Sequence, residues 1–181
     1  LRKRGRCGFR EWDSNCYFEE DLLALSHLAD LAESVEVSEL AAILMDKLFF
    51  TMAINSYKGA FGSTHGRTYT PLILGSQLES TSGISRLMWG MGVWNHHILG
   101  TVSLACSEYE LPSLIASIAT DWPDEMWNRE RHACDGEEVN KVTYKTPDYM
   151  LCSAQDYRPG ERGYQQHIWQ ATMGPDAVVF V

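Results

Sequence analysis

The sequence predicts an α+β fold in which paired helices come first and antiparallel strands follow. Two observations support this prediction. Between residues 19 and 119, apolar side chains recur every three or four positions, which is the spacing of one helix face. From residue 135 onward, β-branched and aromatic residues alternate with polar ones, and turn sequences separate the runs. Because helices precede strands without alternating with them, we divide the chain into a helical domain, 1–134, and a strand domain, 135–181.

The first two predicted helices form an αα-hairpin. One begins near Glu19, where three acidic residues in the first turn interact favourably with the helix dipole. Leu22 and Leu25 then lie on one face of this helix. After a short break near Val35, a longer apolar stripe over residues 37–52 predicts the second helix.

Weaker patterns predict the rest of the helical part. Residues 1–18 are rich in Gly, Arg and aromatic residues, which indicates an irregular loop, and the glycines of residues 55–69 exclude a helix interior. Residues 121–132 combine tryptophans with mixed charges and indicate a short helix with connectors. Further helices, with small residues that permit close packing, are predicted at residues 82–93, 98–106 and 112–119.

The strand domain begins with three strand patterns, at residues 142–144, 149–151 and 167–171, separated by turn sequences that contain Pro and Gly. Residues 177–181 indicate a further strand, and the given sequence ends before the turn that would follow it. Because the chain also lacks an initiator Met, we expect it to be part of a longer protein that continues on both sides.

Composition excludes several kinds of partner. The net charge is −9, so an electrostatic nucleic-acid surface is not expected, and no apolar run is long enough to span a membrane. The five cysteines are widely spaced, which argues against a zinc motif or a disulfide framework. We therefore expect free thiols and a reducing, cytoplasmic compartment, with no evident cofactor. Oligomerisation through the remainder of a longer chain stays open.

The first candidate site is the loop of residues 8–17, which contains Glu11, Trp12, Asn15 and Tyr17. Aromatic rings stack on the C–H faces of sugars, and amides and carboxylates form paired hydrogen bonds with hydroxyl groups. We therefore predict that this loop binds a sugar substrate. The alternative is that these residues cap the following helix and anchor the loop onto the domain.

The second candidate site is the glycine-rich segment 55–69, because long loops on a rigid scaffold are frequent places for function. Its residues suit β-elimination at a uronic acid. That reaction needs a cation or amide donors to stabilise the carboxylate, which Arg67 and Asn55 could supply. It also needs proton transfer, for which His65 and either Tyr69 or Tyr57 are candidates. Tyr57 is in addition a candidate for substrate binding. The alternative is a loop held by its own hydrogen bonds.

The third candidate site lies near the predicted strand at residues 167–171. The segment contains Arg158 and Tyr164, and in a strand His167 and Trp169 share with Gln165 one polar and aromatic face, whereas Tyr164 lies on the other. If that face is directed toward the helices, His167 could complete a cleft between the two domains, which is a frequent position for ligand sites. If the face is directed toward solvent, it is an ordinary sheet surface.

The layout of these motifs resembles the heparinase II/III-like group of polysaccharide lyases and related toroid-fold carbohydrate enzymes. The resemblance covers most of the chain and depends on residues 9–17 ahead of a helix pair, the glycine-rich loop 65–69 and the strand segment 164–169. It implies that the helices are part of an (α/α) toroid and that the strands begin an antiparallel β-sandwich.

The resemblance also implies residue roles. In that group an Asn and a His neutralise the acid group of the substrate, and a Tyr acts in proton transfer. The catalytic residues that match by type are Asn55, His65, Tyr69 and His167, with Arg67 as an added carboxylate clamp. The group usually has its Asn and His adjacent on one helix, so the adjacent pair Asn95 and His96 is a rival assignment. Some members hold a structural zinc in the sandwich, but no complete ligand set is visible in this sequence.

The most favoured function is a polysaccharide lyase that cleaves uronic-acid-containing poly- or oligosaccharides by β-elimination. One alternative is a glycoside hydrolase on the same toroid, which needs two carboxylates beside the scissile bond, and Glu11 and Asp13 are the available pair. Another is a non-catalytic glycan-binding protein that uses the same cleft.

Overall fold

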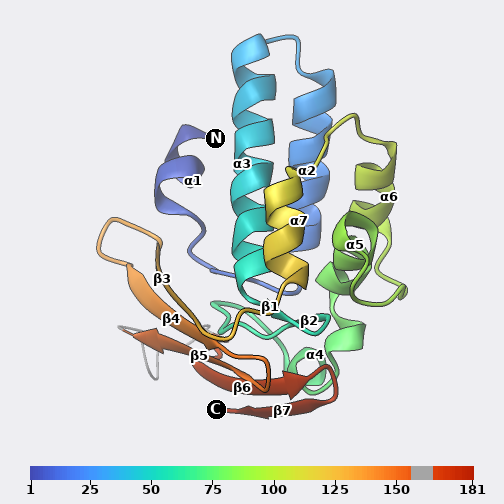
Figure 1. The fold of residues 1–181 in the computed structure, drawn as a ribbon. Coiled ribbons are helices and arrows are strands. Elements are labelled where there is room, and N and C mark those ends of the chain that lie inside the picture. The colour runs from blue at the N-terminus through green and yellow to red at the C-terminus, as the bar shows by residue number, and fades with distance from the viewer. Residues whose placement is uncertain (156–164) are drawn as a thin grey trace.

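Helices form one layer of the molecule, and a five-stranded antiparallel sheet lies beneath them (Figure 1). The computed structural model describes residues 1–155 and 165–181. The predicted mixture of helices followed by antiparallel strands is confirmed at this level. The helices and the sheet meet along two segments: the loop of residues 8–17, before the first long helix, and the segment 55–69, after the second.

The predicted helix hairpin is confirmed by α2 (Phe18–Leu31) and α3 (Val35–Ile54), which lie side by side in Figure 1. The acidic first turn of α2 is present as expected. Leu22 of α2 and Leu48 of α3 are almost completely buried, because the apolar stripes of the two helices face each other in one core.

The three later helices are also confirmed: α5 (Ser80–Trp89), α6 (Leu99–Cys106) and α7 (Ser113–Thr120). They complete the helical core around Phe49 of α3. The Phe49 ring stacks on Tyr109 with 5.6 Å between centroids and meets Trp89 edge-on at 6.3 Å. No helix among the described residues is both long enough and apolar enough to cross a lipid bilayer.

Two stretches differ from their sequence-based predictions. Residues 1–18, predicted as a loop, contain the short helix α1 (Arg2–Cys7). Residues 121–132, predicted as a short helix, form β3 (Met126–His132). The physical reason is that β3 directs polar Asn128, Glu130 and His132 inward, so the strand lacks the apolar alternation by which strands are usually detected.

The glycine-rich segment between α3 and α5 is more regular than a loop. It contains a two-strand hairpin, β1 (Ser56–Tyr57) and β2 (Ala60–Phe61), whose turn residues Lys58 and Gly59 both have positive φ, 50° and 88°. Such a pair of left-handed residues is typical of tight hairpin turns. The short helices α4 (Thr70–Leu74) and η1 (Ser76–Leu78) follow.

The large sheet is a meander, with strand order β3-β4-β5-β6-β7 and antiparallel pairing throughout. It begins at β3, before the predicted division between residues 134 and 135. The strand patterns predicted after that division correspond to β4 (Val139–Lys145), β5 (Met150–Gln155), β6 (Trp169–Gly174) and β7 (Ala177–Phe180).

The face of the sheet that is directed toward the helices is polar. Along β4 the buried positions are Val139, Lys141, Thr143 and Lys145. They pack against buried polar residues of the loop before α2 and of the segment after α3, including Asp13 and Ser63. Two layers therefore meet through hydrogen bonds and ion pairs, and each buried polar group needs a partner.

Candidate functional site

The predicted site residues separate into a solvent-accessible group and a buried group. The solvent-accessible group consists of the exposed Tyr17 and Tyr69 and the half-buried Glu11 and Arg67, which we call the arginine–tyrosine cluster. It joins two of the predicted sites, because Glu11 and Tyr17 come from the loop before α2, whereas Arg67 and Tyr69 come from the glycine-rich segment. The structure thus brings together residues about fifty positions apart in the chain.

The Arg67 guanidinium is the centre of this cluster. It lies over the rings of Tyr17 and Tyr69, at 5.6 and 5.7 Å from their centroids. Its Nη2 donates to the Tyr17 hydroxyl at 3.5 Å and to the Tyr69 hydroxyl at 3.3 Å, and its Nη1 lies 3.4 Å from Oε1 of Glu11. Tyr17 is 36% exposed and Tyr69 is 39% exposed. Both phenols are therefore available to a ligand from solvent.

The cluster has a defined protonation state near neutral pH. The hydrogen bond to Tyr69 raises the pKa of Tyr17, against the opposing effect of Arg67. The hydrogen bond to Tyr69 and the attraction of the Glu11 carboxylate raise the pKa of Arg67, although partial desolvation of the guanidinium has the opposite effect. Tyr17 therefore keeps its proton and can donate it, and Arg67 is a permanent cation that can bind a carboxylate.

An open pocket of about 340 Å³ lies beside the cluster, with Tyr69 in its wall. The opposite part of the wall comes from residues 165–167 and from the end of β7, including Phe180. A ligand in this pocket could contact both Tyr69 and the junction between the layers. Such a position agrees with the predicted cleft between helices and strands.

Backbone packing fixes the direction of the Arg67 side chain. Gly66 donates its N–H to the Trp12 carbonyl at 2.7 Å, and a Cβ at Gly66 would lie 2.5 Å from the Trp12 backbone nitrogen. His65 and His167 pair through two backbone hydrogen bonds of 2.9 Å each, which ties the segment to the sheet. Only glycine fits this close approach of two backbones, and the next residue is thereby directed outward.

The two predicted catalytic histidines also come together, but in the interior. His65 is 1% exposed and His167 is 2% exposed, and their rings stack with 5.3 Å between centroids. His65 Nδ1 donates to the Asp13 carbonyl, and His167 Nε2 donates to the Trp169 carbonyl at 3.0 Å. Burial lowers the pKa of His65 well below its usual value and that of His167 to about 4. Both rings are therefore neutral and turned away from solvent.

Asn55 is buried as well, and its amide is fully engaged. Its Nδ2 donates to Glu130 at 2.8 Å and to the Thr51 carbonyl at 2.9 Å, while its Oδ1 accepts from Thr143 at 2.6 Å. An amide with these partners has no group left for a substrate carboxylate. In this structure Asn55 links α3 to the sheet.

Three predicted substrate-binding residues also lie in the interior. Trp12 is 1% exposed, and its indole N–H donates to Thr64 at 3.4 Å. Asn15 accepts from Thr68 at 2.7 Å, and Tyr57 donates its hydroxyl to the Pro147 carbonyl at 2.6 Å. These contacts match the alternative in which the loop is anchored onto the domain.

The remaining predicted residues are placed as follows. Trp169 begins β6 and is partly buried. Arg158 and Tyr164 lie outside the described residues. Asn95 and His96, the rival pair, lie in the connection between α5 and α6, where Asn95 Nδ2 donates to the carbonyls of Gln77 and Glu79 at 2.9 and 2.7 Å.

A buried charge network is the feature that the sequence did not predict. Lys141 of β4 has no exposed side-chain surface, and it donates to Asp13, to Glu130 at 2.8 Å and to Ser63 at 3.0 Å. Its pKa is raised despite burial, because the two carboxylates attract the ammonium group. In a strand, Lys141 lies on the same face as Val139, and this alternation is the one indication in the sequence that Lys141 is directed inward. Because lysines are rarely buried, the residue type by itself predicts an exposed side chain.

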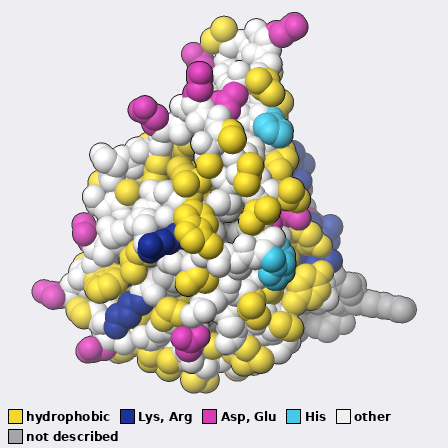
Figure 2. All heavy atoms as spheres, turned by 90° about the vertical axis from the view of Figure 1, so that its right-hand side faces the viewer, with side chains coloured by type: hydrophobic (Ala, Val, Ile, Leu, Met, Phe, Trp, Pro, Cys, Tyr) yellow, Lys and Arg dark blue, Asp and Glu magenta, His cyan; other side chains and the backbone are white. Residues whose placement is uncertain are grey.

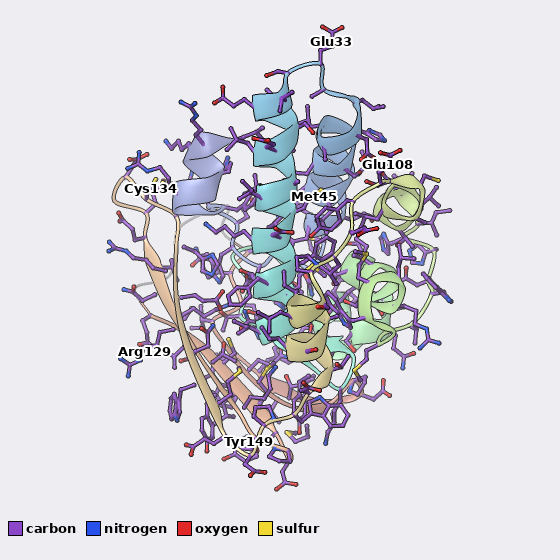
Figure 3. The ribbon with its side chains drawn as sticks, turned by 45° about the horizontal axis from the view of Figure 1, so that its top comes forward. Glu33, Met45, Glu108, Arg129, Cys134 and Tyr149 are labelled. Atoms are coloured by element: carbon purple, nitrogen blue, oxygen red, sulfur yellow. The ribbon has the colours of Figure 1, made fainter. Side chains whose placement is uncertain are left out.

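The thiols are free, as predicted, although only Cys152 is fully buried. Figure 3 shows Cys134 in the β3–β4 connection beside α1. Cys7 of α1 and Cys134 line one pocket of about 280 Å³, and the neighbouring Cys7 thiol raises the pKa of Cys134 to about 11.

Comparison with known proteins gave no match, whether the chain was compared with protein-family models, with curated proteins or with solved structures.

Proposed function

We propose that this protein is a carbohydrate-active enzyme that cleaves uronic-acid-containing glycans by β-elimination, with the arginine–tyrosine cluster as its reactive site. The observation that supports this most is the placement of one guanidinium between two exposed phenols, at hydrogen-bond distance from both hydroxyls. A carboxylate binder and two proton-transfer groups are the parts that elimination next to a carboxylate requires.

The proposed reaction gives each group of the cluster a defined role. The uronate carboxylate binds Arg67 in place of Glu11, and the guanidinium stabilises the negative charge that develops when the neighbouring C–H bond breaks. Tyr69 accepts that proton, and the adjacent cation stabilises the phenolate that this step requires. Tyr17, which holds its proton, protonates the leaving glycosidic oxygen as the C–O bond breaks and a carbon–carbon double bond forms.

Burial explains why the proposal leaves out the other predicted catalytic residues. Asn55 and His65 are buried in the junction between layers, and His167, although it contributes to the pocket wall, is 2% exposed and donates its Nε2 to the Trp169 carbonyl. Their contribution in this proposal is to hold the segment that presents Arg67 and Tyr69.

The hydrolase alternative loses its carboxylate pair. Asp13 is fully buried and paired with Lys141, so it cannot stand beside a scissile bond opposite Glu11. The binding alternative remains distinguishable by turnover, because a binding protein would retain the glycan unchanged.

We also propose that the helices are part of an (α/α) toroid and that the sheet is one layer of a β-sandwich. Figure 2 shows hydrophobic side chains gathered on the face that α4, α5 and α6 form. Leu74, Trp94 and Leu99 are 61%, 60% and 68% exposed. On the outer face of the sheet Trp127 is 61% exposed and lies 4.5 Å from the Tyr144 ring, centroid to centroid. Apolar faces of this kind are typical of surfaces that pack against further helices and strands.

The test is incubation of the purified protein with a panel of uronic-acid polysaccharides while ultraviolet absorbance and reducing ends are both measured. Elimination creates a conjugated double bond, so the proposal predicts that the two signals rise together. New reducing ends without the ultraviolet signal would establish hydrolysis and overturn the proposal. Retention of the polysaccharide without either signal would indicate a binding protein.

Arg67→Lys is the most informative variant for substrate binding. Lysine keeps the charge but loses the planar fork that binds a carboxylate through two hydrogen bonds. We expect KM to rise by roughly tenfold, a loss of about 1.4 kcal/mol of binding. Arg86→Lys is the matched control, because Arg86 donates to the Gly90 carbonyl at the end of α5 and does not belong to the cluster.

A further inference from the structure

A second group of chemically active side chains lies at the junction between the layers, away from the arginine–tyrosine cluster. Asp13 from the loop before α2, together with Glu130 and His132 from β3, places one ligand atom each within 4.8 Å of the others. The Nε2 atom of His132 lies 3.9 Å from Oδ1 of Asp13 and 3.7 Å from Oε1 of Glu130.

Two of these three atoms lack a hydrogen-bond partner although they are buried. Oδ1 of Asp13 and Nε2 of His132 make no hydrogen bond, and the two residues are 0% and 8% exposed. A buried carboxylate oxygen or imidazole nitrogen without a partner costs about 1–3 kcal/mol, more for a charged group. The two atoms lie 3.9 Å apart, which is close enough for one added ligand to satisfy both.

A small cavity adjoins this point. It measures about 10 Å³, and Asp13, Thr51 and His132 contribute to its wall. A space of this size is about that of a single water molecule. A water could therefore occupy a further coordination position beside the three protein atoms.

The charges around this point leave room for a cation. Lys141 contacts Oδ2 of Asp13 and Oε2 of Glu130, Asn55 donates to the same Glu130 oxygen, and Thr51 donates to Oε1 at 3.3 Å. Asp13, Glu130 and Lys141 together carry one negative charge, and Lys47, which also lines the cavity, donates its ammonium group to the Gly5 carbonyl at 2.7 Å instead of to these carboxylates. The Lys141 contacts also turn the other oxygen of each carboxylate toward His132.

We propose that Asp13, Glu130 and His132 bind one divalent transition-metal ion of the zinc type. One imidazole nitrogen with two carboxylate oxygens and a water is a donor set that such ions accept. In a tetrahedral zinc site, bonds of about 2.0–2.2 Å place the ligand atoms roughly 3.3–3.6 Å apart. The two separations from His132, 3.7 and 3.9 Å, would close by a few tenths of an ångström, and the two carboxylate oxygens, which lie within 4.8 Å of each other, would approach to the same range when the ion binds. The ion would fasten the loop of Asp13, and with it Glu11, to β3.

The test measures binding and not activity. Protein freed of metal with a chelator is titrated with Zn²⁺ in a calorimeter, and in parallel with Co²⁺, whose visible spectrum reports the ligand number and type. The proposal predicts one equivalent of Zn²⁺, a Co²⁺ spectrum of a four-coordinate nitrogen and oxygen site, and a rise in melting temperature with bound ion.

His132→Asn should weaken Zn²⁺ binding by at least about tenfold, which is 1.4 kcal/mol. His97→Asn is the matched control, because the adjacent His96 and His97 rings, 4.2 Å apart at their centroids, form the surface pair most prone to incidental binding. Binding that vanishes with His97→Asn and survives His132→Asn would overturn the proposal. Absence of binding to the wild-type protein, or an octahedral all-oxygen Co²⁺ spectrum, would overturn it without reference to any variant.

Discussion

Removal of the Lys141 ammonium is the sharpest test of how the two layers are held together. Lys141→Met keeps most of the side-chain volume and removes the charge and its three hydrogen bonds. In protein kept free of metal by a chelator, Asp13, with no exposed surface, and Glu130, with 13% of its side chain exposed, would then face each other without the ammonium group that pairs with both. Two buried like charges are far less stable than a buried ion pair.

The expected loss follows from this burial. Breaking a buried ion pair by deleting one partner costs about 3–5 kcal/mol, because the remaining charge stays desolvated. The three partners of Lys141 place the variant in this range, and the coupled loss of the Ser63 hydrogen bond at 3.0 Å adds to it. For a urea dependence of about 2 kcal/mol per molar, the midpoint of unfolding would fall by roughly 2 M.

The assay is urea unfolding at neutral pH, followed by tryptophan fluorescence. Lys3→Met is the matched control, because Lys3 pairs with Asp135 at 2.7 Å but is exposed, so its loss should leave the midpoint nearly unchanged. Adding Asp13→Asn to Lys141→Met should recover part of the loss, since it removes one of the two uncompensated charges. If Lys141→Met lowered the free energy of unfolding by less than about 1 kcal/mol, the buried network would be refuted.

Three further predictions concern the junction and the helical layer. Burial lowers the pKa of His167 from 6.5 to about 4, so the unfolded chain takes up a proton that the folded chain does not, and stability should fall by roughly 3 kcal/mol as pH falls through this range. His167→Asn should reduce this dependence in urea unfolding at several pH values, and the part that remains comes from His65, whose pKa burial also lowers. Gly66→Ala should destabilise by about 1–3 kcal/mol, because its Cβ would lie 2.5 Å from the Trp12 backbone nitrogen; thermal unfolding measures this. Because Cys7 and Cys134 line the same pocket, a short thiol cross-linker should join them, as peptide mass spectrometry would detect.

Each of these has an outcome that would contradict it. An unchanged pH dependence in His167→Asn would show that other groups determine acid stability. Equal stability of Gly66→Ala and Gly174→Ala, whose Cβ meets nothing within 4 Å, would show that the close approach is relaxed. Cross-linking of Cys7 to Cys106 in preference to Cys134 would contradict the placement of α1 beside the β3–β4 connection.

The helices were predictable because their apolar stripes face a single hydrophobic core. The stripe of residues 37–52 corresponds to α3, and its inward residues such as Leu44 and Phe49 are buried as the spacing requires. The same rule failed for β3, where Glu130 and His132 occupy inward positions. Periodicity detects the direction of a side chain only when apolar residues mark the interior.

The site was predicted in part for a related reason. Residue types in the loop before α2 and in the glycine-rich segment identified Arg67, Tyr69 and Tyr17, and the structure joins these three. The same reasoning treated His65 and Asn55 as accessible, because polar residues in a glycine-rich loop are usually exposed. They are buried because the layers meet through polar groups, and no local pattern distinguishes that junction from an active-site cleft.

The most direct test of the central claim is turnover of a polyuronate by wild-type protein and by Tyr69→Phe, measured as unsaturated product at saturating substrate. Tyr144→Phe, which removes a phenol from the outer face of the sheet, is the matched control. The account predicts product from the wild type and the control, and a fall in kcat of at least about 100-fold for Tyr69→Phe with KM nearly unchanged. Equal turnover by wild type and Tyr69→Phe would contradict the claim that the arginine–tyrosine cluster performs the elimination.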